Sequence, residues 1–160
     1  MKKEGLFPMI ALACDHTALE MKQGIKDLLD EMGLEYRDYG THTPESCDYP
    51  RFGYRAAKAV ADGVCDRAII LCGTGEGIGM AASKVKGTRV CIASDPYSAE
   101  LSKRHNNANV LSMGARVLGI EAAKQIARAW LTASFEGGRH QRRIDMIAAI
   151  ENGTFEDQED

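Results

Sequence analysis

The stretch AIILCGTGEGIG, residues 68–79, is the part of the sequence that decides the fold. It opens with four apolar residues, two of them β-branched, which is typical of a strand buried on both faces of a parallel sheet. Alternating glycines follow, and the run MAASK at residues 80–84 then favours a helix. A strand, a glycine-rich loop and a helix N-terminus in succession present backbone N–H groups to an anion. We therefore expect a functional site at this loop.

The spacing of the glycines excludes two common nucleotide-binding motifs. The loop contains four alternating glycines: Gly73, Gly75, Gly77 and Gly79. This spacing does not fit the dinucleotide fingerprint G-x-G-x-x-G, and no G-x-x-x-x-G-K-[ST] occurs. Glycines alone would also fit an ordinary strand-to-helix turn. Cys72 and Thr74 add a thiol and a hydroxyl at the mouth of the loop, and both side chains can take part in chemistry.

Composition limits the class of protein. A length of 160 residues with 44% hydrophobic content predicts one soluble domain, residues 1–160, that ends in an acidic, solvated tail at about 151–160. The net charge of −3 gives no reason to expect nucleic acid or a membrane as partner. The sequence starts without a signal-peptide pattern, and its five cysteines include no C-x-x-C pair. We expect a cytoplasmic protein without a disulfide framework.

Apolar periodicity divides the chain into alternating strands and helices. The expected strands lie at 9–14, 34–39, 68–71, 88–93 and 109–113, and the expected helices at 18–32, 52–60, 80–84, 96–105, 120–131 and 139–150. Strict alternation predicts a Rossmann-like, three-layer α/β/α sandwich around a five-stranded parallel sheet, with an extra C-terminal helix. We predict the flavodoxin-like strand order 2-1-3-4-5.

In that order the first and third strands are neighbours, and a crevice opens at their carboxyl ends. The strands end in Cys14-Asp15-His16 and Cys72-Gly73-Thr74, so the fold brings two polar clusters together. Asp15 has two interpretations, a cap for the next helix or part of a site. The adjacent His16 favours a site, because imidazole titrates near neutral pH and can donate to an anion.

Two further residues have both a structural and a chemical interpretation. Cys72 is either an inert buried thiol or, because a helix N-terminus favours the thiolate, a base or nucleophile. His105 either complements the dipole at a helix C-terminus or, like His16, serves as the histidine partner that a nucleophilic Cys72 needs and that only the fold can supply. The four histidines show no i, i+4 pair on one helix, so we expect no metal site.

Arginines open the last predicted helix. Arg139 and Arg143 lie in or near its first turn, where positive charge opposes the helix dipole, so local stability does not explain them. They are four residues apart and share a face, which suits capture of a phosphate or carboxylate. The alternative is a basic surface patch that pairs with the acidic tail.

Taken together, these motifs resemble the ribose-5-phosphate isomerase B family, which includes allose- and galactose-6-phosphate isomerases. The matching motifs run through nearly the whole chain: 14–16 (CDH), 48–50 (DYP), 72–75 (CGTG), 95–99 (DPYSA), 104–106 (RHN), 109–111 (NVL), 114–116 (GAR) and 136–140 (EGGRH). One branch of the family has a glutamate base just after the glycine loop. Ile78 occupies that place here, so the sequence matches the cysteine branch.

The resemblance implies an aldose–ketose isomerase that uses no metal and no organic cofactor. It implies that ribose 5-phosphate and ribulose 5-phosphate interconvert through a cis-enediol(ate), in the pentose phosphate pathway. It also implies a homodimer with active sites shared between subunits, while assembly into a dimer of dimers stays open. A six-carbon sugar phosphate as substrate, or a non-catalytic phospho-sugar-binding protein, remain the alternatives.

The resemblance also implies roles for single residues. Cys72 is the base between C2 and C1, Thr74 relays a proton between O1 and O2, His105 assists ring opening, and Asp15 lies near the sugar hydroxyls. Phosphate binding is implied for His16, Arg116, Arg139 and Arg143, and sugar contacts for Tyr49 and Asn106. Independently of the resemblance, backbone N–H groups of the loop, among them Gly73, Gly75 and Gly77, are suited to stabilise an oxyanion.

Overall fold

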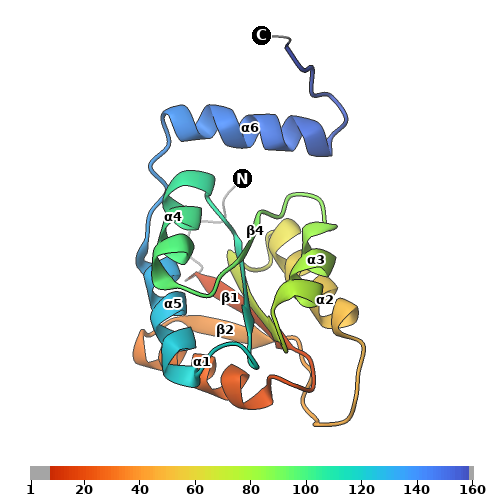
Figure 1. The fold of residues 1–160 in the computed structure, drawn as a ribbon, viewed down its shortest axis with the longest axis vertical. Helices are drawn as coiled ribbons and strands as arrows, with labels where there is room; N and C mark the ends of the chain where they lie inside the picture. Colours follow the sequence, from red (N-terminus) through yellow and green to blue (C-terminus); the bar gives the residue numbers. More distant parts are fainter. Residues whose placement is uncertain (1–7, 159–160) are drawn as a thin grey trace.

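The computed structural model describes residues 8–158, which form a parallel sheet between two layers of helices (Figure 1). The strands are β1 (Met9–Cys14), β2 (Glu35–Asp38), β3 (Arg67–Cys72), β4 (Val90–Ile92) and β5 (Val110–Gly114). The helices are α1 (Leu19–Glu31), α2 (Tyr49–Ala61), α3 (Glu76–Ser83), α4 (Pro96–Asn106), α5 (Ile120–Thr132) and α6 (Arg139–Glu151). The three-layer prediction is confirmed. None of the helices in the described part is long and apolar enough to cross a membrane.

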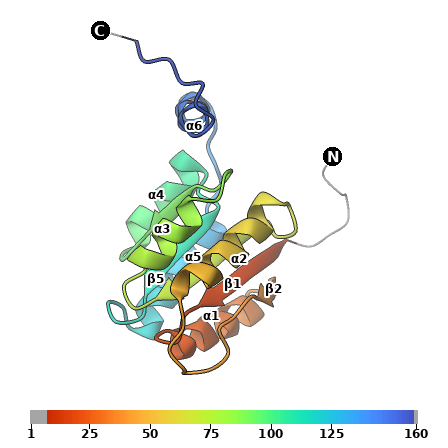
Figure 2. The same ribbon diagram turned by 90° about the vertical axis from the view of Figure 1, so that its right-hand side faces the viewer.

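The alternation of side chains along the central strand builds both halves of the core. Ile69 and Leu71 of β3 face the cluster that contains α1, α5 and the fully buried Trp130. Ala68 and Ile70 face the opposite cluster, which contains α2 and α3. Successive side chains of a strand point to opposite faces, so a run of apolar residues is buried on both sides. Figure 2 shows α2 and α3 on one side of the sheet and α1 on the other.

The predicted strand order was wrong at one edge of the sheet. The order is β2-β1-β3-β5-β4, so β5 and not β4 lies next to β3. All five residues of β5 are buried, whereas β4 has only three residues and its Ile92 is 40% exposed. Burial therefore favours β5 inside the sheet and the short β4 at its edge. The pairing of β1 with β3, on which the predicted crevice depends, is confirmed.

The helix after the glycine loop begins earlier than expected. We placed its opening at Met80, but α3 starts at Glu76, and Met80 lies in its second half. Gly75 makes this early start possible, because it takes a left-handed conformation with φ of 82° at the N-cap. A Cβ at Gly75 would lie 2.8 Å from the carbonyl carbon of Met113, so there is also no room for a side chain. The N-cap of α3, Gly75, is therefore only three residues from Cys72.

The ends of the later helices agree with the sequence signals. The carboxylate of Asp95 caps α4 by accepting the Ser98 N–H at 2.7 Å, and Asn107 ends that helix with φ of 47°. The last helix starts at Arg139, as expected. It includes Glu151, so the acidic tail begins one residue later than predicted, and the Thr154 N–H bonds back to the carbonyl of Ala149.

Candidate active site

Cys72 is the last residue of β3, and its thiol faces the N-terminus of α3. The side chain is 5% exposed, and its Sγ accepts the N–H of Gly75 at 3.2 Å. The next hydroxyl in the loop, Thr74 Oγ1, accepts the N–H of Glu76 at 3.2 Å. Both side chains thus accept from amides at the start of a helix, where the partial charge is positive. Such a site stabilises negative charge on sulfur.

Asp15 lies next to Cys72 at the carboxyl end of the sheet. The N–H of Asp15 donates to the carbonyl of Leu71 at 3.1 Å, which places Asp15 beside the end of β3. The carboxylate is 6% exposed, and its Oδ1 accepts both the N–H of Thr17 at 2.9 Å and the Thr17 hydroxyl at 2.6 Å. These bonds close a local turn and do not cap α1, which has no side-chain cap. The interpretation of Asp15 as a helix cap was therefore wrong.

The strand order brings Arg116 to the same loop. The N–H of Ala115 donates to the carbonyl of Cys72 at 2.8 Å, and the N–H of Arg116 donates to that of Gly73 at 2.9 Å. A Cβ at Gly73 would lie 3.5 Å from the Arg116 Cδ, so the arginine side chain passes over this glycine. Adjacency of β5 and β3 is what creates this contact.

His16 and Tyr49 also lie at this end of the sheet. The Nδ1 of His16 accepts the N–H of Cys47 at 3.3 Å, which leaves Nε2 as the ring nitrogen that can donate to a ligand. The Tyr49 ring covers Gly77, where a Cβ would lie 2.6 Å from the tyrosine Cζ. The loop after β1 and the start of α2 thus add two polar side chains, His16 and Tyr49, to the cluster around Cys72.

The remaining predicted site residues lie at the opposite end of the molecule. The side chain of Arg89, just before β4, donates through Nε to the carbonyls of Asn106 and Asn107 at 3.0 and 3.1 Å. The end of α4, with His105 and Asn106, therefore lies at the amino end of the sheet. Figure 1 shows α6, which starts at Arg139, lying across this same end. A single chain does not bring this second group to Cys72.

This second group has an organisation that sequence reasoning missed. The rings of His105 and His140 stack with centroids 4.3 Å apart and planes 9° from parallel, and Glu136 lies against both. The i, i+4 spacing of Glu136 and His140 was the available signal, but those two residues straddle the start of α6 and are not on one helix.

The same three side chains offer ligand atoms within 4.8 Å of one another, which our spacing argument against a metal did not consider. The geometry does not suit a shared ion, because an imidazole nitrogen binds metal in the plane of its ring. The planes of His105 and His140 are stacked, so an ion in one plane lies outside the other. The arrangement suits a pair of imidazoles that share a carboxylate.

The surroundings of Cys72 differ from those of Cys14, Cys65 and Cys91 in the hydrogen-bond donor near the sulfur. Desolvation raises the pKa of Cys14 to about 11, and burial also raises the pKa of Cys65 and of Cys91. These three groups stay as neutral thiols near neutral pH. Cys72 differs in that it accepts an N–H at a helix N-terminus.

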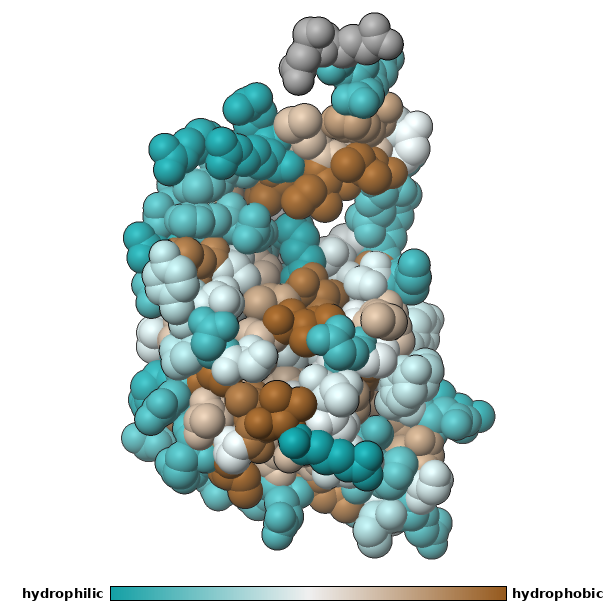
Figure 3. Space-filling view, viewed as in Figure 1, coloured by the Kyte–Doolittle hydropathy of each residue, from teal (hydrophilic) through white to brown (hydrophobic). Residues whose placement is uncertain are grey.

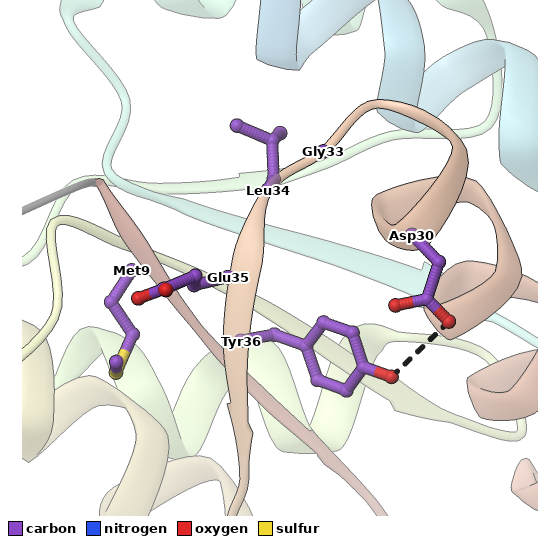
Figure 4. Close-up of a pocket in the computed structure, with 6 residues that line it drawn as sticks. All are labelled: Met9, Asp30, Gly33, Leu34, Glu35 and Tyr36. Atoms are coloured by element: carbon purple, nitrogen blue, oxygen red, sulfur yellow. Dashed lines mark hydrogen bonds between the residues drawn. The ribbon is translucent and has the colours of Figure 1, made fainter.

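One pocket of about 470 Å³ lies elsewhere, between the start of β2 and the end of α1 (Figure 4). Its polar groups are Asp30, Glu35 and Tyr36, and the Tyr36 hydroxyl donates to Asp30 Oδ2 at 3.5 Å. Two carboxylates and a phenol do not attract a phosphate, so this pocket does not compete with the loop at Cys72 as a substrate site.

A parallel α/β sheet with a thiol and a hydroxyl at the mouth of a glycine-rich loop defines an α/β enzyme with its centre at a topological switch point. Over residues 10–147 the sequence matches the family described as Ribose/Galactose Isomerase. The ribose-5-phosphate isomerase B of Escherichia coli (strain K12) is 50% identical over 142 residues, which cover 89% of this chain and 95% of that relative. This chain therefore belongs to the ribose/galactose isomerase family, and the resemblance is confirmed.

Solved structures agree with this assignment. A ribose-5-phosphate isomerase B from Clostridium thermocellum has a TM-score of 0.89 and 46% identity, and the match covers 91% of this chain and 98% of that chain. The ribose-5-phosphate isomerase B from Mycoplasma genitalium, solved with bound ribulose-5-phosphate, has a TM-score of 0.86 and 38% identity. That match covers 90% of this chain and 96% of that chain. The overlap spans almost the full length of both neighbours.

Proposed function

We propose that this protein interconverts ribose 5-phosphate and ribulose 5-phosphate, with Cys72 as the base that moves a proton between C2 and C1. The observation that carries this proposal is the 3.2 Å hydrogen bond from the Gly75 N–H to the Cys72 Sγ. An N–H donor at a helix N-terminus stabilises the thiolate, which is the basic form. The names of the similar proteins support the same substrates.

Removing a proton beside a carbonyl creates an oxyanion that needs fixed donors. The amides of Gly75 and Glu76 already donate to Cys72 and Thr74. The amides of Gly73, Thr74 and Gly77 are therefore the donors that we assign to the enediolate. Thr74 Oγ1 is fixed by the Glu76 N–H and keeps its own proton free, which suits a relay between O1 and O2. Asp15, held by Thr17, is assigned to the sugar hydroxyls.

A complete site requires a second copy of the chain. His105, Asn106, Arg139 and Arg143 lie at the amino end of the sheet, whereas Cys72 lies at the carboxyl end. We assign a two-fold dimer in which each site takes the Cys72 loop from one subunit and the His105 group from the other. Contacts of one chain alone leave the two groups apart.

The surface of α6 supports this assembly. Three of its large apolar side chains, Met146, Ile147 and Ile150, are 42, 48 and 61% exposed in the single chain. Figure 3 shows apolar atoms gathered along the side of α6 that faces the rest of the molecule. Exposed apolar side chains in a group mark a protein–protein interface. Because α6 also carries Arg139 and Arg143, docking of this helix on a second subunit would deliver both arginines to a site.

The substrate phosphate is assigned to the basic side chains. Arg116 and His16 belong to the Cys72 half of the site, and Arg139 and Arg143 to the other half. Binding of the unreacting phosphate by both halves would position C1 and C2 at Cys72. No metal or organic cofactor takes part in this scheme, so we expect full activity in the presence of a chelator such as EDTA.

The deciding experiment measures kcat/KM for aldose and ketose phosphates of four, five and six carbons, in both directions. We expect the highest value for ribose 5-phosphate and ribulose 5-phosphate. A higher value for allose 6-phosphate or galactose 6-phosphate would contradict the pentose assignment. Tight binding of a sugar phosphate without any turnover would instead indicate a non-catalytic binding protein.

A further inference from the structure

The stacked pair of His105 and His140 has a feature that the proposed mechanism does not use. The family resemblance implies that His105 assists ring opening, and it leaves His140 without a role. Yet His140 is only 7% exposed, and its ring lies flat on the ring of His105 at 4.3 Å and 9°. A buried polar ring stacked on a functional one fixes the plane of its neighbour.

A carboxylate and an arginine hold this pair in place. Glu136 Oε2 lies 3.9 Å from His105 Nε2, and Glu136 Oε1 lies 4.0 Å from His140 Nε2. Glu136 is itself fixed, because Arg104 Nε donates to its Oε2 at 2.7 Å and the Glu136 N–H donates to the carbonyl of Arg104 at 3.0 Å. The two oxygens of one fixed carboxylate thus face one imidazole each.

The charged groups around the pair favour a neutral His140. The groups that face it are His105 from α4, Glu136 from the preceding loop, and Arg139 and Arg143 from α6 itself. Burial, together with the nearby His105 and arginines, lowers the pKa of His140 from its usual value near 6.5, although Glu136 acts in the opposite direction. Glu100 pairs with Arg104 at 3.0 Å, which offsets part of the positive charge on that side.

We propose that His140 is a positioning residue for His105, which it holds by the flat face of its neutral ring in the orientation that opens the sugar ring. This inference rests on the proposed function, and on ribose 5-phosphate entering as a furanose. In the step concerned, His105 gives a proton to the ring oxygen as the C1–O4 bond breaks. The anomeric hydroxyl releases its proton to water as C1=O1 forms, so the substrate gains one proton from His105 and loses one to solvent.

The test compares His140→Phe with His140→Leu. Both substitutions keep a buried apolar side chain, but only phenylalanine keeps a flat aromatic face. We expect kcat/KM for ribose 5-phosphate within about threefold of wild type for His140→Phe, and about 10–100-fold lower for His140→Leu, since small misplacements of a catalytic group cost this much. Thermal unfolding of both variants checks that the fold is retained.

A second measurement separates ring opening from proton transfer at carbon. Ribulose 5-phosphate has its O5 blocked by phosphate and forms no furanose, so exchange of its C1 proton with deuterated water needs the base but no ring opening. We expect this exchange at wild-type rates in both His140 variants and its loss in Cys72→Ala. Equal kcat/KM in the two His140 variants, or loss of exchange in His140→Leu, would overturn the positioning role.

The pH profile gives an independent check. If His140 stays neutral and acts through its ring face, His140→Phe keeps the same pH dependence of kcat/KM as wild type. If the pH profile of kcat/KM for His140→Phe lacks an ionisation that the wild-type profile shows, His140 itself titrates during catalysis, which contradicts the proposal. A wild-type protein that neither isomerises ribose 5-phosphate nor exchanges the C1 proton of ribulose 5-phosphate would overturn the proposed function itself.

Discussion

The amide N–H of Gly75 donates to the Sγ of Cys72 at 3.2 Å, across the first turn of the glycine-rich loop. The contact depends on the left-handed backbone of Gly75, with φ of 82°, which lets α3 begin at Glu76, only four residues after Cys72. One loop thus supplies both the thiol and the donor that stabilises its charged form.

Replacing Cys72 by alanine should remove the base and leave the phosphate site intact. We expect kcat to fall by about 10²–10⁴-fold, the usual effect of losing a general base, with little change in KM. The variant should also lose sensitivity to alkylating reagents. Steady-state kinetics with and without iodoacetamide measure both effects, and Cys65→Ala serves as a control for loss of another buried thiol. Near-normal turnover of Cys72→Ala would show that the base is wrong, and Glu76 would be tested next.

Replacing Arg143 by alanine should mainly raise KM. The guanidinium is assigned to the substrate phosphate, so its loss weakens binding, with a smaller loss of kcat because positioning also suffers. A substrate analogue without the phosphate should react poorly with wild type and be nearly indifferent to this change. Arg142→Ala is the matched control, because Arg142 points to another face of α6 and lines a pocket with the tail residues Thr154 and Phe155. Equal effects of the two substitutions on KM would contradict a specific phosphate contact.

Mixing two inactive variants should restore activity if each site is shared between subunits. Cys72→Ala and His105→Ala damage opposite ends of the chain, so a hybrid dimer would contain one intact site and one doubly damaged site. After random exchange of subunits, half of the dimers are hybrids, and one of the two sites in each hybrid is intact. The mixture should therefore have about a quarter of wild-type activity. Activity is measured after unfolding and refolding the mixture. Absence of recovery, or a fully active monomer by light scattering, would contradict the shared site.

Adding a methyl group at Gly114 should displace the loop at Cys72. A Cβ there would lie 2.5 Å from the carbonyl carbon of Thr74, which is backbone and cannot rotate away. We expect a loss of about 1–3 kcal/mol in the free energy of unfolding, together with a lower kcat because Thr74 moves. At Gly119 a Cβ would meet no atom within 4 Å, so Gly119→Ala is the control. Thermal unfolding and kcat of both variants test the prediction, and wild-type behaviour of Gly114→Ala would contradict it.

Asp38 should make the stability depend on pH in the acid range. Burial alone would raise the pKa of this carboxyl, but hydrogen bonds from Lys26, the Gly40 N–H and Lys22 outweigh burial and lower it below the usual 3.8. The folded state therefore binds this proton less tightly than the unfolded state. The stabilisation is present above about pH 3.8 and is lost as the pH falls through the lower folded-state pKa. We expect Asp38→Asn to unfold at lower temperature than wild type at pH 7, with the difference shrinking below pH 3.8.

The size of the stability loss in Asp38→Asn follows from the burial of Lys22, the partner of Asp38. Lys22 is 4% exposed, and removing the charge of Asp38 leaves this ammonium group buried without its carboxylate, which costs about 3 kcal/mol. Asp62→Asn is the matched control, because Asp62 pairs with Lys58 and both side chains are about half exposed. Exposed pairs contribute less than about 1 kcal/mol. Equal shifts in the melting temperature for the two variants would contradict the argument.

The sequence by itself determined the elements and the chemistry of the Cys72 loop. Strands, helices and the loop 72–75 follow from residues that are neighbours along the chain, where periodicity and glycine spacing act locally. The sequence also predicted that the polar residues at the ends of β1 and β3 meet, because parallel strands with alternating helices place their carboxyl ends at one edge of the sheet. The start of α3 was misplaced because the sequence does not show which glycine takes a left-handed conformation.

Only the tertiary structure decided which distant segments meet. It placed β5 beside β3, and with it Arg116 over Gly73, because burial of a whole strand against its neighbours is not visible in the strand itself. It stacked His140 on His105, although the two residues are 35 positions apart along the chain, and it put both at the end of the sheet opposite Cys72. Such contacts depend on how complete elements pack, and packing is a property of the assembled fold.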